Sequence, residues 1–192
     1  MPVTTQATAT TLALKEWGAV AQALLDGRQT VLLRKGGIHE KRFEVGRDTF
    51  VLFPTVAHSH RERVRDEHLD LIPLGEADVA DGRLTVRCGV TLAGVVPVER
   101  PEGLSDIQDL HIWTAESVRR DRLEFRPKHR LQVLVVRAVA LPEPVTLPRL
   151  DEYGGCRSWL DLPLSWDGRK GRPVHADDRL AADVERVRAA VG

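Results

Sequence analysis

The groups in this sequence that are best suited to bind a ligand are basic side chains that lie beside glycines. Arg34 and Lys35 directly precede Gly36 and Gly37. Glycines allow a ligand to approach the backbone closely, and cations at that point could hold the phosphates of a nucleic acid. The sequence therefore predicts a cationic rim at this turn, although the same cations could instead pair with Asp and Glu side chains.

Two more arginines and three aromatic residues extend this pattern. Arg137 interrupts an apolar run and Arg157 follows a glycine pair, while Trp113, Tyr153 and Trp159 could offer stacking surfaces. Aromatic rings beside guanidinium groups suit the unpaired bases of single strands. A cation inside a buried strand needs a partner or an opening, so we expect Arg137 to have one of the two.

Histidines supply an incomplete metal pattern. His58 and His60 stand two residues apart and His68 follows, in a segment rich in charged residues. Imidazoles at that spacing could share a zinc ion, but no matched set of ligands follows at the expected distance along the chain. We therefore expect no metal and no cofactor.

Hydrolytic patterns are also incomplete. Asp121, Glu124 and Lys128 only approximate the carboxylates and lysine that would hold Mg²⁺ near an activated water. Ser158 does not lie in a Gly-x-Ser-x-Gly turn, and a packed structural role for Cys156 is simpler than a nucleophilic one. The sequence thus favours a protein without catalytic activity and leaves a metal-dependent phosphodiesterase or nuclease as the alternative.

The composition describes an ordinary globular protein with balanced charge. Among 192 residues, Lys plus Arg and Asp plus Glu each number 28, so a polyanion site must arise from local segregation of charge. No apolar run approaches the ~20 residues that span a bilayer, and the N-terminus does not resemble a secretory signal. With two cysteines, a reducing environment fits, and we expect a cytoplasmic protein that does not enter a membrane.

Hydrophobic spacing predicts the elements that must position these residues. Apolar residues recur every three or four positions over residues 12–26, which predicts a helix capped by Thr10 or Thr11 and ended at Gly27. Residues 29–34 and 49–53 read as strands, the second closed by Pro54. Residues 58–72 predict a short surface helix.

The second half of the chain gives clearer patterns. Residues 83–99 alternate as a long strand, with Gly89 and Gly94 marking a bulge or bend. Thr114 is placed to cap a helix over residues 115–123, and residues 131–141 form a nearly continuous apolar strand. Prolines at positions 142, 144 and 148 then predict an extended connection.

These elements predict an α+β protein with a curved, mostly antiparallel sheet or a small β-barrel of about five to seven strands, flanked by helices. We expect a disordered tail over residues 1–11 and a single domain over residues 12–164. A linker over residues 165–176 then leads to an amphipathic helix at residues 177–192. The sequence does not indicate an oligomeric state.

Five short motifs follow one another along the chain: ALKEW at 13–17, LRKGGI at 33–38, FPT at 53–55 with His58, LHIW at 110–113 and YGGCRSW at 153–159. Together they resemble the prokaryotic family called domain of unknown function 1802. The resemblance runs from about residue 12 to residue 162. It implies no established activity, but association of some members with restriction-endonuclease-type domains implies a link to DNA restriction or defence.

A second, looser resemblance concerns the first third of the chain. In the ASCH branch of PUA-like domains, a helix leads to Gly-x-Lys-x-x-Glu-x-Arg and then to a small barrel. Gly27 and Arg34 match this pattern, whereas Gln29 and Leu32 replace the lysine and the glutamate. The resemblance implies the fold and puts in doubt any activity that depends on the two replaced residues.

Together, the residues and the resemblances predict a non-catalytic or accessory nucleic-acid-binding domain of PUA-like type, with DNA or RNA as the partner. A protein–protein module that docks through the last helix is a further alternative. The candidate nucleic-acid-binding residues are Arg34, Lys35, Gly36, Gly37, Thr55, His58, Trp113, Arg137, Arg157 and Trp159.

Overall fold

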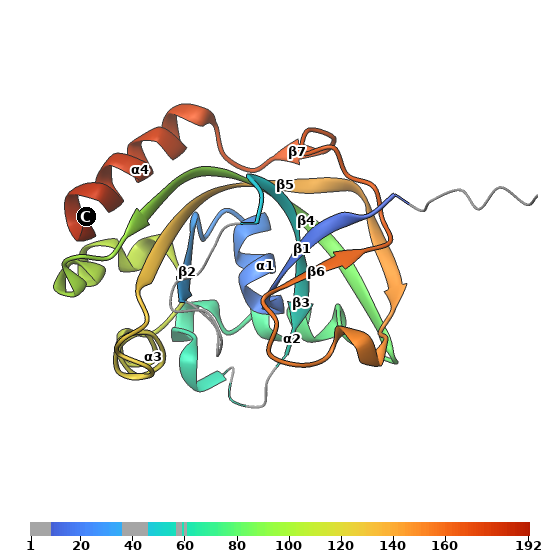
Figure 1. Cartoon of the computed structure of the whole chain (residues 1–192), viewed down its shortest axis with the longest axis horizontal. Coiled ribbons are helices and arrows are strands. Elements are labelled where there is room, and N and C mark those ends of the chain that lie inside the picture. The colour runs from blue at the N-terminus through green and yellow to red at the C-terminus, as the bar shows by residue number, and fades with distance from the viewer. Residues whose placement is uncertain (1–8, 36–45, 57–58, 60) are drawn as a thin grey trace, which may run out of the picture.

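One strongly bent sheet organises the chain, and helices pack on both of its sides (Figure 1). The computed structural model describes residues 9–35, 46–56, 59 and 61–192. The strands are β1 (Thr11–Trp17), β2 (Val31–Lys35), β3 (Thr49–Thr55), β4 (Arg83–Pro97), β5 (Leu131–Pro148), β6 (Trp159–Leu162) and β7 (Arg172–Pro173). Their order is β2-β5-β4-β3-β1-β6, with β7 paired to β5. This is the predicted α+β architecture.

The helices are short, apart from the last. They are α1 (Gly18–Leu25), α2 (Leu71–Ala77), α3 (Ala115–Val118) and α4 (Asp177–Val191). Tighter or wider turns complete them: η1 (Arg61–Arg63), η2 (Asp66–His68), η3 (Pro101–Leu110), η4 (Arg119–Glu124) and η5 (Asp151–Tyr153). Of these turns, η4 has π-helical hydrogen bonding and continues α3 without a break.

The sheet curls but does not close into the barrel that was the second form of the fold prediction. Within the described residues, every strand pair is antiparallel except β1 with β3, and the end strands β2 and β6 are not paired to each other. Register shifts in the β4–β5 pair, between Val86 and Cys88 and between Leu92 and Gly94, fall near the two glycines expected to mark a bulge. Such shifts increase local twist and bend the strands over helix α1.

The expected helix over residues 12–26 is wrong in its first half, where the chain forms β1. Residues of β1 alternate between two apolar clusters, with Leu14 in the first and Ala13 in the second. Pairing with β3 on one side and β6 on the other overrides the helical spacing. The helix begins only at Gly18, with Trp17 as its N-cap in place of Thr10 or Thr11, and Gly27 has the positive φ of 76° expected after its end.

Prolines lie inside strands where the sequence suggested strand ends. Pro54 belongs to β3, and the three prolines at 142, 144 and 148 belong to β5. The β3–β4 ladder stops at Val51, and among the described strands the outer half of β5 pairs with β4 alone. Each proline therefore lies on a stretch with an unpaired edge, where the missing N–H removes no ladder hydrogen bond.

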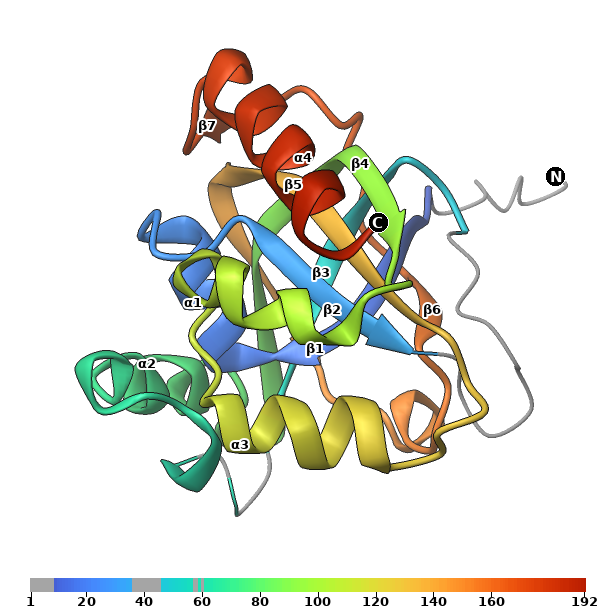
Figure 2. The same cartoon turned by 90° about the vertical axis from the view of Figure 1, so that its left-hand side faces the viewer.

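Local signals at two other helices are confirmed. The Thr114 hydroxyl accepts a hydrogen bond from the Ser117 N–H at 3.1 Å, as expected for the cap of α3. Helix α4 buries Leu180, Val184 and Val187 and lies over the convex side of β4 and β5, whereas α1 lies on the concave side (Figure 2). The expected surface helix over residues 58–72 is replaced by the turns η1 and η2 and the start of α2.

Two apolar clusters form the interior. The larger one joins α1, the inner halves of β4 and β5, and α4, while the smaller one lies between β1, β3, β6 and the outer halves of β4 and β5. Since alternate residues of a strand face opposite sides, neighbouring residues of β1 belong to different clusters. No helix among the described residues is long and apolar enough to cross a membrane.

Candidate nucleic-acid interface

The seven candidate residues that the structure describes do not form one rim. Gly36, Gly37 and His58 lie outside the described residues. Arg34 and Lys35 are together at the end of β2, as their adjacency requires. The other five are spread over the interior, the outer side of β5 and the far face of β1.

Arg34 is held inside the protein. Its guanidinium lies 3.2 Å from the Glu16 carboxylate and donates to the Lys15 carbonyl, and the Arg34 side chain is only 13% exposed. Glu16 is buried and also accepts the Trp17 N–H at 2.9 Å. Because β2 and β1 are far apart in the order of the sheet, this ion pair spans the opening of the curled sheet. Its role is structural.

Lys35 fixes the end of η4. Its ammonium group donates to the Arg122 carbonyl at 2.7 Å and to the Phe125 carbonyl at 2.6 Å. Burial lowers the pKa of Lys35, and the nearby Arg122 guanidinium lowers it further. Since carbonyls at a helix end lack partners within the helix, a lysine there stabilises the end of the segment. Lys35 therefore positions the residues that follow η4.

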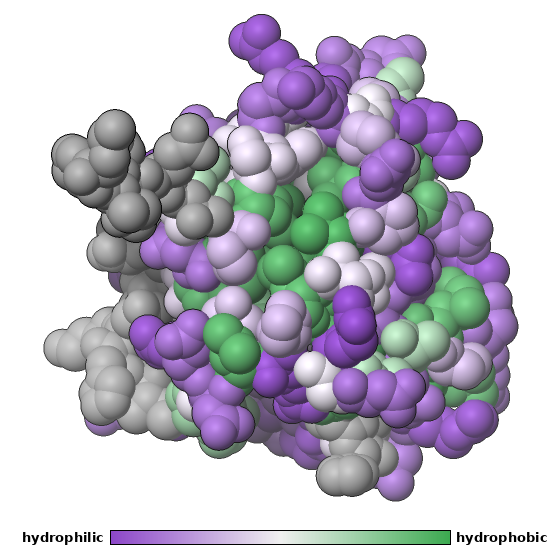
Figure 3. All heavy atoms as spheres, turned by 90° about the vertical axis from the view of Figure 1, so that its right-hand side faces the viewer, coloured by the Kyte–Doolittle hydropathy of each residue, from purple (hydrophilic) through white to green (hydrophobic). Residues whose placement is uncertain are grey.

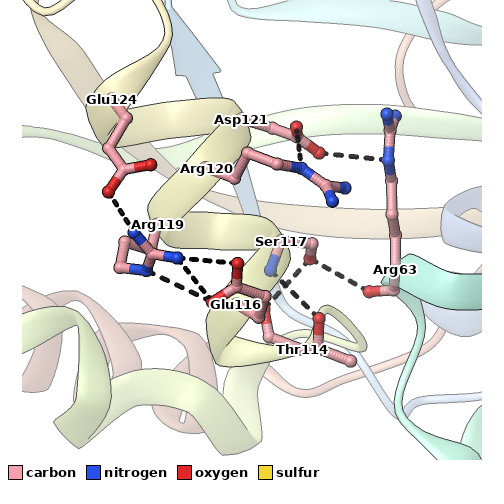
Figure 4. Close-up of polar contacts among 8 residues, drawn as sticks. All are labelled: Arg63, Thr114, Glu116, Ser117, Arg119, Arg120, Asp121 and Glu124. Atoms are coloured by element: carbon pink, nitrogen blue, oxygen red, sulfur yellow. Dashed lines mark hydrogen bonds and ion pairs between the residues drawn. The ribbon is translucent and has the colours of Figure 1, made fainter.

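The carboxylates of α3 and η4 are already used within this segment (Figure 4). Asp121 pairs with Arg63 at 3.2 Å and with Arg120 at 3.1 Å. Glu116 lies 2.7 Å from Arg119, which also pairs with Glu124. Ser117 donates to the Arg63 carbonyl at 3.0 Å and secures the helix to η1. Each carboxylate drawn in Figure 4 is thus matched by an arginine.

The turn after η4 carries charge that is not matched in this way. Residues 119–130 contain six Lys or Arg and two Asp or Glu, and both of those carboxylates pair within the helix. Among the described residues, no carboxylate forms an ion pair with Arg126, Lys128 or Arg130. Local segregation of charge, which a chain of zero net charge requires for polyanion binding, occurs here.

An exposed aromatic ring stands at the head of this turn. Phe125 is 59% exposed, and the Arg126 guanidinium lies 4.9 Å from the centre of its ring. Arg126 has a φ of 52°, which few non-glycine residues adopt, and the His129 N–H closes the turn on the Arg126 carbonyl at 2.9 Å. The residues Phe125, Arg126, Lys128 and Arg130, together called the basic turn, were missed as candidates. Their signal was the dense run of cations around one phenylalanine.

Both predicted tryptophan platforms pack against another aromatic ring. Trp113 is only 6% exposed and meets Trp17 edge to face, with 4.7 Å between ring centres. Trp159 meets Phe50 in the same manner at 5.0 Å. Trp113 is therefore enclosed, whereas Trp159 is half-buried, and both rings pack against the interior.

The remaining cations lie elsewhere. Arg137, as expected, has a partner: it pairs with Asp177 at the start of α4, on the convex side of the sheet. Arg157 donates to the Glu152 carbonyl at 2.9 Å, and its charge adds to the effect of burial in lowering the pKa of Lys15. Thr55 donates to the Glu16 carbonyl at 3.1 Å and lines the groove that contains Lys15.

No group of three or more His, Cys, Asp or Glu side chains capable of holding a metal occurs in the described parts of the chain. Cys88 is buried, and burial raises the pKa of its thiol to about 12. A thiol in that state is a poor nucleophile at neutral pH.

A comparison with known protein families agrees with the five motifs. A family model described as domain of unknown function (DUF1802) matches residues 13–186. No curated protein matches the chain. Two solved structures from Zymomonas mobilis are similar, the ASCH protein and a point mutant of it. Each has a TM-score of 0.43 and 12% identity and covers 90% of this chain, with 93% of the mutant chain and 94% of the other chain covered in return.

Proposed function

The chain belongs to the family described as domain of unknown function (DUF1802), and we propose, from the residues on its surface, that it binds single-stranded nucleic acid at the basic turn. The observation that carries the proposal is the exposed ring of Phe125 beside three cations without carboxylate partners among the described residues. A base stacks on the ring while Arg126, Lys128 and Arg130 hold the phosphates.

The chemistry of the turn favours single strands over a duplex. A phenylalanine ring offers a face to any unstacked base, whereas the bases of a duplex are stacked and out of its reach. Guanidinium groups add cation–π and phosphate contacts without reading sequence. The proposal therefore includes little sequence preference and a strong dependence on salt.

Arg34 and Lys35 serve this surface indirectly. Lys35 donates hydrogen bonds to the two carbonyls at the end of η4, and Arg34 joins β2 to β1 through its ion pair with Glu16. The proposal therefore moves the cationic surface expected at these two residues to the neighbouring turn that they support. A link to DNA restriction or defence depends on whether the basic turn binds DNA or RNA. The test therefore includes both nucleic acids.

The test is fluorescence anisotropy of labelled single-stranded RNA, single-stranded DNA and duplex DNA at two salt concentrations. The variant Lys128→Ala/Arg130→Ala removes two unmatched cations. Its matched control, Arg119→Ala/Arg120→Ala, removes two cations that are paired with carboxylates on the same segment. We expect the first variant to weaken single-strand binding about tenfold and to lower the salt slope by about one to two.

The control should change affinity by less than about twofold, as exposed paired charges contribute little. Equal losses in both variants would indicate a diffuse electrostatic effect and overturn the basic turn as the site. Absence of binding by the wild-type protein to all three nucleic acids at low salt would overturn the function itself.

A further inference from the structure

A groove of about 460 Å³ opens on the face of β1 opposite to Glu16, at the edge of the smaller apolar cluster. Lys15 and Thr55 form one part of its wall, and Arg149, Leu150 and Tyr153 form another. Pockets that hold small molecules have volumes of about 300–1,000 Å³. This groove has the size of a small-molecule site and is separate from the basic turn.

Lys15 has unused capacity in this groove. Its ammonium group donates to the carbonyls of Gly154 at 3.3 Å and Gly155 at 3.1 Å, and it lies 5.9 Å from the centre of the Phe53 ring. An ammonium has three N–H donors, so one remains. No carboxylate within the described ranges forms an ion pair with Lys15, and burial, followed by the charge of Arg157, lowers its pKa. An anion placed here would supply the missing counter-charge.

A second cation faces the same space. Arg149 is exposed and lines the groove, and its N–H donates to the Gly82 carbonyl at 2.8 Å, which fixes the backbone at that point. Asp151 also lines the groove, so the two cations leave an excess of positive charge. Lysine and arginine together are a common means of holding a phosphate.

Apolar surface adjoins these charges. Phe53 and Tyr153 meet edge to face with 5.7 Å between ring centres, and Val56 and Leu150 are 39% and 44% exposed. Figure 3, which views the right-hand side of Figure 1, shows apolar side chains gathered near the centre of that face, with hydrophilic residues around them. A ligand that fits both parts carries a phosphate and a flat, weakly polar ring.

We propose that this groove binds a nucleoside monophosphate, with the phosphate between Lys15 and Arg149 and the base against Leu150 and Val56. The site needs no part of the basic turn. The two sites therefore stand or fall separately.

The test is isothermal titration calorimetry with AMP, adenosine and inorganic phosphate, using the full chain. We expect AMP to bind at least about tenfold more tightly than adenosine or phosphate alone, because both parts of the groove are then engaged. Lys15→Met should weaken AMP binding about tenfold or more, and Arg149→Ala should weaken it by a smaller factor. Arg188→Ala, which removes an exposed cation on α4, should leave it unchanged.

Lys15 also holds the 154–155 loop, so Lys15→Met is checked by thermal unfolding and by amide spectra without ligand. Wild-type amide shifts on adding AMP should centre on Phe53, Gly154 and Gly155. Shifts elsewhere, or equal affinity for AMP and inorganic phosphate, would overturn the nucleotide site. Retained AMP binding in Phe125→Ala supports its independence, and loss there would overturn it.

Discussion

The two faces of strand β1 use charge in opposite ways. On one face, Glu16 meets Arg34 in an enclosed ion pair that joins distant strands. On the other, the neighbouring residue Lys15 is held by two backbone carbonyls at the wall of a groove. Two adjacent charged residues thus have different roles: Glu16 stabilises the fold on one face, and Lys15 can bind an anion on the other. The following experiments test that contrast, beginning with the largest expected effect.

Glu16→Gln should lower the free energy of unfolding by about 3 kcal/mol, since it removes the charge from one partner of an enclosed ion pair. Lys15→Met should change it by less than about 1 kcal/mol, because that variant removes no ion pair formed with the described residues. Urea unfolding of both variants at neutral pH measures the difference. Similar losses in the two would show that the faces are not distinct.

His111 should make the stability of the protein sensitive to acid. It is buried, and burial, aided by the charge of Arg65, lowers its pKa to about 4, with Asp109 opposing. A base whose pKa is lower in the folded state contributes stability above its ordinary pKa of 6.5 and loses it as the pH falls toward 4. We expect a loss of about 2 kcal/mol between pH 7 and pH 5 from this group.

The check is urea unfolding at the two pH values for the wild type and for His111→Asn. The difference between pH 7 and pH 5 should shrink in the variant, which has no imidazole to protonate. An unchanged difference would assign the acid sensitivity to other groups.

Phe125→Ala should weaken single-strand binding by about tenfold, the effect expected from loss of one stacked base. It should leave AMP binding in the Lys15 groove unchanged, because Phe125 is not among the residues that line that groove. Phe125→Trp, which keeps a ring, is the matched control and should restore binding. Failure of the tryptophan variant would argue against stacking.

Arg126→Gly should have the smallest effect on stability, and of opposite sign. Glycine adopts the positive φ of this position without strain, so the free energy of unfolding should rise by up to about 1 kcal/mol. Single-strand affinity should nevertheless fall, since the guanidinium beside Phe125 is gone. A variant that is more stable but binds more weakly would mark Arg126 as retained for function.

Strong local patterns predicted much of the fold. The long strands β4 and β5, the Thr114 cap and helix α4 follow from alternation, a single side chain and helical spacing. Strand β1 was missed because both of its partners lie far along the chain. Gly18, a poor residue for the middle of a helix, was the available signal that the helix starts later.

The candidate sites were harder to predict for a related reason. The charge of residues 119–130 is visible in the sequence, but which cations are neutralised depends on how α3 and η4 pair their carboxylates. The Lys15 groove combines residues near positions 15, 53 and 150, which only the curled sheet brings together. The spacing of these residues along the chain therefore predicts neither arrangement.

The pairing of β1 with β6 has a consequence for how the chain folds. Thr11 pairs with Leu162, and the Lys15 N–H donates to the Ser158 carbonyl at 2.8 Å. Contacts between segments so distant in sequence close slowly, because a long loop must be ordered first. During synthesis on the ribosome, the edge of β1 that pairs with β6 therefore stays unpaired until residues 159–162 emerge. In that interval a chaperone could bind this edge.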